Sequence, residues 1–229
     1  MPTDFLPSRD GLAFTNTWPP EPALSLPSPF GTIGIGNAAN GLCGGMIFAA
    51  LDYWNAGRPA PVSRPAGGSP LYQFIVRRLI DSWHLPVGVA RYYEWMNLPD
   101  ANTRVQLRGR RVGTVRGLTQ RTIARQWPRV RASLDHGRPA ALGVVTMASA
   151  WPGELGRNHQ VLAYAYQAEG TAVTVRLYDP NAGPDDRVAL SFDTAPSAGR
   201  PAIDHNISIA GPVRGFFMTA YSPALPPAS

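Results

Sequence analysis

The spacing of hydrophobic residues changes about two thirds of the way along the chain. Up to residue 137, apolar residues recur every three or four positions in several stretches, which predicts helices. After residue 138, β-branched and aromatic residues form short runs bounded by Gly, Pro, Asn or Asp, which predicts strands. Helices followed by strands are typical of an α+β protein with an antiparallel sheet.

Start and stop signals delimit the predicted helices. Gly57 is a plausible residue after the last turn of the first helix, and Ser69 with Pro70 marks an N-cap and first turn. Thr119 is the expected N-cap of the last helix, where Pro128 predicts a kink or two abutting helices. The four helical stretches lie within residues 44–57, 69–85, 87–98 and 119–137.

Six stretches of the second half predict strands, and the arginine-rich segment before the last helix is a candidate hairpin. The sequence QAEGTA, around Glu169 and Gly170, reads as the turn between two paired strands. The strand predictions cover residues 139–149, 159–170, 172–181, 187–193, 205–210 and 213–222.

The two ends of the chain differ from its middle. Residues 1–30 form a proline-rich N-terminal extension, which disfavours helix and central strand and predicts an extended surface segment. Its apolar residues Phe5, Leu6, Phe14 and Trp18 are expected to anchor it. One hypothesis is that this segment lies across a cleft as an inhibitory or structural strap. Residues 31–223 are expected to form a single domain, and 224–229 a tail.

Composition restricts the class of protein. A chain of 229 residues with 44% hydrophobic content is long enough for one large core. Its lone cysteine excludes an intrachain disulfide and a cysteine-rich zinc site, and its scattered histidines give no metal-binding spacing. We expect no cofactor. The N-terminus lacks the features of a standard signal peptide, and no stretch has the length of a membrane span. A soluble, cytoplasmic protein is expected, with non-standard secretion as an alternative.

All 21 basic residues are arginines, and the net charge is +6. A solvated face is one interpretation; binding of nucleic acid or another acidic partner is the other. No known nucleic-acid-binding motif accompanies the cluster. Its members are Arg104, Arg108, Arg110, Arg111, Arg116, Arg121, Arg125, Arg129 and Arg131.

The lone Cys43 stands where the loop GNAANGL becomes a predicted helix. A buried cysteine is often only a small apolar residue of the core. A thiolate is the reactive form, and both a helix N-terminus and a neighbouring imidazole favour it. Gly44 and Gly45 follow directly and let a backbone or a substrate approach closely.

Among the four histidines, His159 has the most suggestive position. It begins a strongly apolar strand, and the next strand ends at Asp179 in the sequence LYDPN. The turn lies about ten residues from each, so antiparallel pairing predicts that the imidazole and the carboxylate lie side by side. His84 and His136 are interpreted as helix-end residues, and His205 as the start of a short strand.

The segments NGLCGG, NHQVLAYAY and LYDPN occur in an order that resembles the papain-like cysteine peptidase superfamily. The bacterial double-glycine leader peptidase-like group is the most similar in its motifs. The resemblance covers local motifs over residues 35–193 and implies a helical half packed on an antiparallel sheet.

The resemblance also implies residue roles. Cys43 would be the nucleophile, His159 the general base and acid, and Asp179 the orienting carboxylate of a thiol protease or amidase. Such enzymes carry a glutamine six positions before the cysteine to bind the oxyanion; this chain has Asn37 there, and Asn40 is a rival. The reaction is acyl transfer from a peptide or other amide substrate.

The loop before His159 is expected to border the cleft. Trp151 could contact substrate or pack on the sheet, and Asn158 is a further candidate for substrate binding. Two other functions stay open at this point. One is a catalytically inactive papain-like protein that binds a peptide or a protein, which the Asn37 departure favours. The other is an arginine-rich binder of nucleic acid or anionic surfaces.

Overall fold

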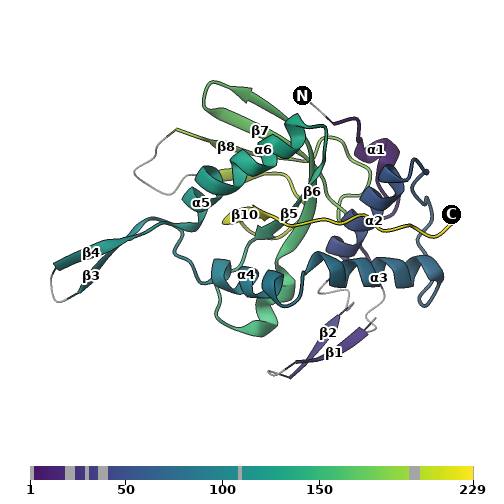
Figure 1. The fold of residues 1–229 in the computed structure, drawn as a ribbon, viewed down its shortest axis with the longest axis horizontal. Coiled ribbons are helices and arrows are strands. Elements are labelled where there is room, and N and C mark those ends of the chain that lie inside the picture. The colour runs from purple at the N-terminus through teal and green to yellow at the C-terminus, as the bar shows by residue number, and fades with distance from the viewer. Residues whose placement is uncertain are drawn as a thin grey trace.

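A six-stranded antiparallel sheet in the order β10-β5-β6-β7-β8-β9 forms the centre of the molecule (Figure 1). The computed structural model describes residues 3–18, 24–28, 31–35, 41–107, 110–195 and 202–228. The predicted α+β class with an antiparallel sheet is confirmed. The six strands are β5 Ala140–Val145, β6 His159–Glu169, β7 Ala172–Tyr178, β8 Ala189–Asp193, β9 Ile203–His205 and β10 Gly215–Met218.

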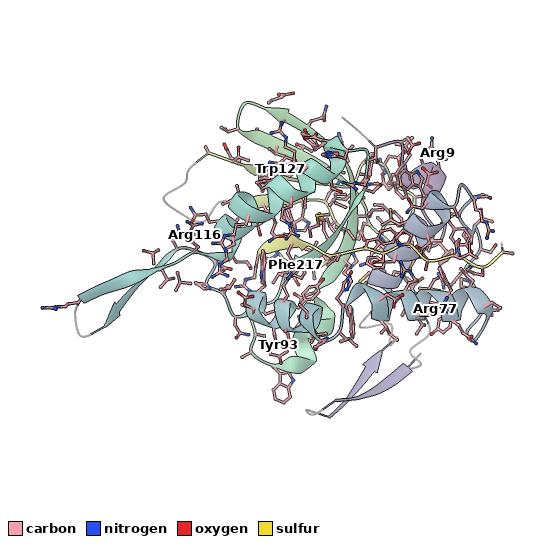
Figure 2. All side chains as sticks on the ribbon, viewed as in Figure 1. Arg9, Arg77, Tyr93, Arg116, Trp127 and Phe217 are labelled. Atoms are coloured by element: carbon pink, nitrogen blue, oxygen red, sulfur yellow. The ribbon has the colours of Figure 1, made fainter. Side chains whose placement is uncertain are left out.

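Helices cover both faces of the sheet. Along β5, Ala141 packs with the core of α2 and α3, whereas Leu142 and Val144 pack with Trp127 of α6 on the opposite face. This alternation is the period of a strand buried on both sides. Figure 2 shows side chains, among them Trp127 and Phe217, filling the space between sheet and helices. The helices are α1 Pro7–Asp10, α2 Cys43–Asn55, α3 Pro70–Ser82, α4 Val87–Met96, α5 Leu118–Arg121 and α6 Trp127–Asp135.

Most of the predicted helix starts and interruptions are present in the structure. Ser69 caps α3 by accepting a hydrogen bond from the Tyr72 backbone N–H at 3.3 Å. Near Pro128 the chain passes through a π-helical turn, Thr122–Gln126, before α6 begins, so the predicted interruption is confirmed. The predicted Thr119 cap is wrong: α5 begins at Leu118, and the Thr119 hydroxyl donates instead to the distant Arg214 carbonyl at 2.9 Å.

The strand predicted over residues 205–210 is also wrong. Strand β9 ends at His205, and the next residue, Asn206, turns its side chain back to β8. Its side-chain oxygen accepts from the Ala189 N–H at 2.7 Å, and its Nδ2 donates to the Arg187 carbonyl at 3.1 Å. Together with the Asn206 N–H, which donates to the Ala189 carbonyl at 3.2 Å, these bonds end the pairing with β8, and the residues that follow form a loop beside Asp179.

Residues 3–18 pack into the core. Phe5, Phe14 and Trp18 are buried, as expected for anchors, whereas Leu6 is 40% exposed. The expectation that this segment contains no helix is wrong: α1 begins at Pro7, because a missing N–H is tolerated in a first helical turn. Further on, β1 Leu24–Ser28 and β2 Gly31–Ile35 form a separate hairpin (Figure 1).

The segment after β10, including the C-terminal tail, crosses α2, runs alongside α3 and contacts both helices (Figure 1). The buried carboxylate of Asp52 accepts hydrogen bonds from the Tyr221 hydroxyl at 2.7 Å and the Ala224 N–H at 2.9 Å. Arg78 forms an ion pair with Asp52 at 2.7 Å and donates to the Ser222 carbonyl at 2.8 Å. The tail therefore closes the helical side of the core.

Candidate active site

Cys43 is the first residue of α2, and its side chain is buried. The N-terminal end of a helix carries a positive partial charge that favours an anion. The loop before it is held by Asn16, whose side-chain oxygen accepts a hydrogen bond from the Leu42 N–H at 2.8 Å. The thiol is thus fixed in position by a residue from the distant N-terminal segment.

His159 and Asp179 are brought together by the β6–β7 hairpin. The hairpin turns at Gly170 (φ 60°), pairs Glu169 with Ala172, and contains an irregularity between Ala163 and Ala165. Asp179 is the first residue after β7. Its Oδ1 lies 2.7 Å from His159 Nε2, so the predicted proximity of the two residues is confirmed.

Three donors hold the buried carboxylate of Asp179. Besides His159, the Asn181 N–H donates to its Oδ1 at 2.9 Å, and the Ser208 N–H donates to its Oδ2 at 2.7 Å. Burial alone raises the pKa of Asp179, but these hydrogen bonds and the His159 charge outweigh it, so the pKa lies below its ordinary value. Asp179 is therefore an ionised acceptor with a fixed orientation.

The imidazole of His159 lies between this carboxylate and the thiol. Because Nε2 faces Asp179, the other ring nitrogen is left for the hydrogen bond with the Cys43 side chain. Burial lowers the pKa of His159, but the charges and hydrogen bonds of Cys43 and Asp179 reverse this effect and raise it to about 10. The arrangement favours the protonated imidazole of His159 beside the ionised carboxylate of Asp179.

A buried tyrosine completes the surroundings of the thiol. The Tyr92 hydroxyl, from α4, donates to the His159 carbonyl at 3.2 Å. Burial, assisted by the charge of Cys43, raises the pKa of Tyr92 well above its ordinary value, so the phenol stays neutral. Sequence analysis missed Tyr92, because nothing local in α4 distinguishes this residue from a core aromatic.

A cleft of about 450 Å³ opens beside the three residues. Cys43 and His159 form part of its wall, and much of the rest comes from three separate segments: the N-terminal segment, the loop between β5 and β6, and the loop after β9. The other lining residues are Asn16, Thr17, Gly41, Thr146, Met147, Gly156, Arg157, Asn158, Asn181, Ser208, Ile209 and Ala210.

The N-terminal segment contributes a residue that sequence analysis missed. Asn16 donates from Nδ2 to the Asn181 side-chain oxygen at 3.0 Å, and its own oxygen also accepts from Trp18 Nε1 at 3.0 Å. It joins the loop before Cys43 to the loop after Asp179. Its place in a polar trio, TNT, between aromatic anchors is the signal that could have identified it.

The two glycines after Cys43 serve helix packing. A Cβ on Gly44 would lie 2.6 Å from Gln160 Nε2, and one on Gly45 would overlap the Ile75 carbonyl oxygen of α3. Neither glycine is among the residues that line the cleft. Close approach is needed here, as predicted, but the approaching atoms belong to the protein, so we no longer expect substrate contact at Gly44 or Gly45.

Of the two residues predicted to bind substrate from the loop before His159, one lines the cleft and the other does not. Asn158 lines the cleft and organises the loop: its oxygen accepts from the Thr146 N–H at 3.2 Å, and its amide donates to the Leu155 carbonyl at 3.1 Å. Trp151 is 70% exposed, so it does not pack on the sheet, and it is not among the cleft residues. Asn37 and Asn40, the expected oxyanion ligands, lie outside the described residues.

The remaining histidines have backbone carbonyls as partners. His84 Nε2 lies 2.7 Å from the Ala220 carbonyl oxygen, and His136 Nδ1 lies 2.6 Å from that of Ala132. His205 Nε2 lies 3.2 Å from the Gly211 carbonyl oxygen. None of the three lines the cleft, so His159 is the histidine of the site.

The arginine cluster extends over the hairpin β3 Thr103–Leu107 and β4 Arg110–Val115, which points away from the sheet (Figure 1), and over the helices that follow. Arg121 pairs with Glu94 at 3.0 Å, and Arg131 with Asp135 at 3.5 Å. Arg108 lies outside the described residues, and Arg104 and Arg111 are described only by their strand backbone. The side chains exposed to solvent include Arg110, Arg116, Arg125 and Arg129.

Comparisons with models of protein families, with curated proteins and with solved structures found no match for this chain. Within the described residues, no three His, Cys, Asp or Glu side chains are placed to hold a metal ion. No helix in the same part of the chain is long and apolar enough to cross a membrane.

Proposed function

We propose that the chain is a cysteine-dependent acyl-transfer hydrolase that acts on a peptide or another amide. The observation that carries this proposal is the hydrogen-bonded row Cys43, His159 and Asp179, of which Cys43 and His159 line the cleft and Asp179 is buried behind them. A structural cysteine needs no buried imidazole beside it, and a structural histidine needs no buried carboxylate. The three together match the requirements of a thiol nucleophile, its base and an orienting acceptor.

The reaction follows from the roles of these atoms. His159 takes the thiol proton, and the Cys43 sulfur attacks the carbonyl carbon of the substrate. The C–N bond then breaks as the imidazolium of His159 protonates the leaving amine, which leaves a thioester on Cys43. Water attacks the thioester with His159 again as base, and the products are a carboxylic acid and the free thiol.

Asp179 keeps its negative charge throughout and fixes the imidazole in the orientation that this proton transfer needs. The developing oxyanion needs donors near Cys43. The Cys43 backbone N–H is one candidate, because the first N–H groups of a helix have no carbonyl partner within it. A side-chain amide from Asn37 or Asn40 would be the second.

The resemblance to papain-like cysteine peptidases is part of the same proposal. The nucleophile helix α2 packs on a sheet whose β6–β7 hairpin carries His159 and Asp179, which is the arrangement that the resemblance implies. Asn37 stands where such peptidases carry a glutamine. Because of this difference, the alternative function is a protein of the same fold that binds a peptide without cleaving it.

Alkylation by iodoacetamide tests the proposal directly, because Cys43 is the only thiol in the chain. The rate is measured against pH for the native protein and for the His159→Ala variant. We expect fast alkylation below pH 7 that His159→Ala abolishes. His136→Ala is the matched control, because His136 is exposed and has only a helix-end carbonyl as its partner.

Two results would oppose the proposal. One is an inert thiol, and the other is a pH midpoint near that of a free thiol, about 8.5, with no dependence on His159. A reactive thiol then calls for a substrate screen, in which Cys43→Ala must abolish hydrolysis. If Cys43→Ala leaves peptide binding intact and no hydrolysis is found in the native protein, the cleft is a binding site.

A further inference from the structure

A second, much smaller cavity shares Cys43, Gly156 and Asn158 with the cleft but is lined mostly by other residues. It encloses about 30 Å³ between α2, α3, α4 and the loop before His159. Its walls are mainly apolar and include Leu79, Trp83, Val89 and Leu155. About 10–15 Å³ of space measured in this way holds one water molecule, so the cavity has room for a group of two or three heavy atoms.

Gln160 provides an unusual polar atom in this cavity. Its side chain is only 3% exposed, and among the described residues its Oε1 has no hydrogen-bond partner. The amide lies next to the first turn of α2, since a Cβ on Gly44 would be 2.6 Å from Gln160 Nε2. A buried carbonyl oxygen without a hydrogen bond is unfavourable, so this position calls for a donor from elsewhere.

The orientation of the Gln160 amide follows from its neighbour. The Ser82 hydroxyl donates its single proton to the Leu79 carbonyl at 2.7 Å, so towards Gln160 it can only accept. Gln160 must therefore present Nε2 to Ser82, at 3.1 Å, and Oε1 is the acceptor without a partner. Exchanging the two atoms would place an acceptor against an acceptor.

The Tyr92 and Asn158 side chains of the cavity already have partners. The Tyr92 hydroxyl donates to the His159 carbonyl, and the Asn158 amide donates to the Leu155 carbonyl. Neither supplies a donor to Gln160. Gln160, with its one acceptor that has no partner, and Cys43 thus both line this mainly apolar cavity.

We propose that this cavity is a specificity subsite for a short side chain that carries a hydroxyl group, as in serine. The side chain belongs to the residue whose carbonyl Cys43 attacks, and Gln160 Oε1 accepts its hydrogen bond. This inference rests on the proposed function. The cavity volume excludes longer side chains, and the apolar walls disfavour charged ones. Gln160 is then a specificity residue that takes no part in bond breaking.

Acyl-amino-acid chloromethyl ketones test the subsite without a known substrate. The Cys43 thiolate displaces chloride, so a C–S bond forms and the C–Cl bond breaks. The serine reagent is compared with the 2-aminobutyrate reagent, in which a methyl group replaces the hydroxyl at nearly the same size. We expect inactivation of the native protein to be about 10- to 100-fold faster with the serine reagent, because the methyl group leaves the buried acceptor unpaired.

The Gln160→Met variant removes the acceptor at similar volume. It should reduce the preference for serine to near one, and because the preference is a ratio of two rates in the same protein, a general change in thiol reactivity cancels from it. A preference near one in the native protein overturns the inference, whether or not the variant folds. So does a preference that persists in a folded Gln160→Met protein.

The two proposals fail in different ways. Fast, His159-dependent iodoacetamide alkylation with equal rates for the two ketones supports the proposed function and refutes the subsite. A thiol that reacts with none of these reagents refutes the proposed function, and the subsite with it. A serine preference that is independent of Gln160 means that the hydroxyl binds elsewhere in the cleft.

Discussion

Replacing Asp179 with asparagine should lower the pKa of His159 while leaving the shape of the site nearly unchanged. The rise of that pKa from 6.5 to about 10 corresponds to about 5 kcal/mol in favour of the imidazolium. The hydrogen bond between Asp179 and His159 is 2.7 Å long and joins two ionised groups. Such a bond contributes about 1.5–3 kcal/mol, so we expect the pKa of His159 to fall by about one to two pH units in Asp179→Asn.

NMR of the imidazole C–H groups measures this change. The chain has four histidines, and the signal missing from His159→Ala identifies the one of interest. Asp185→Asn is the matched control, because Asp185 follows in the same loop but pairs with Arg187 at the surface. An unchanged His159 pKa in Asp179→Asn, or a native value near 6.5, would refute the ion pair between these two residues.

The same substitution should also change stability in a pH-dependent way. The pKa of Asp179 is lowered in the folded protein, so its carboxylate stabilises the fold above the unfolded value of about 3.9. This contribution is lost as pH falls through the lower folded pKa. We therefore expect the difference in unfolding free energy between native and Asp179→Asn to be constant near neutral pH and to shrink below about pH 4.

Two further predictions concern the helical half, and both are measured as free energies of unfolding in urea. Gly45→Ala forces a methyl group against the backbone of α3 and should cost about 1–3 kcal/mol, whereas Gly67→Ala, with open space around it, should cost far less. Arg78→Met leaves the buried charge of Asp52 unpaired and should cost about 3–5 kcal/mol; Arg131→Met, at an exposed ion pair, should leave stability nearly unchanged. Equal costs within either pair would contradict the contacts described for it.

The central pair of the site could be predicted because it depends on local pairing. His159 and Asp179 belong to one hairpin, whose turn at Gly170 can be recognised from the sequence. The two residues lie about equally far from this turn, so antiparallel pairing places them side by side. The position of Cys43 could be predicted once the start of the helix was recognised. The helix itself was marked by its hydrophobic period and by Gly57 beyond its end.

The residues that the sequence did not reveal reach the site from remote segments. Asn16, Tyr92 and Ser208 lie in an N-terminal loop, in α4 and beyond β9, and only the tertiary fold brings them to the Cys43–His159–Asp179 row. The same cause explains the errors. Threonine is a common N-cap residue, but the Thr119 hydroxyl donates to the Arg214 carbonyl, 95 residues away, because a long-range partner overrides the local preference for capping.

The N-terminal segment shows why the two halves of the site hold their relative position. One amide, that of Asn16, accepts from the Leu42 N–H before the thiol and donates to Asn181 after the carboxylate. Phe5 and Trp18, on either side, are buried in the core, so the segment cannot leave without exposing apolar surface. The strap hypothesis predicts a more reactive thiol when residues 2–30 are removed. The contacts of Asn16 predict the opposite, because the loop that carries Cys43 would lose the bond that sets its distance from Asp179.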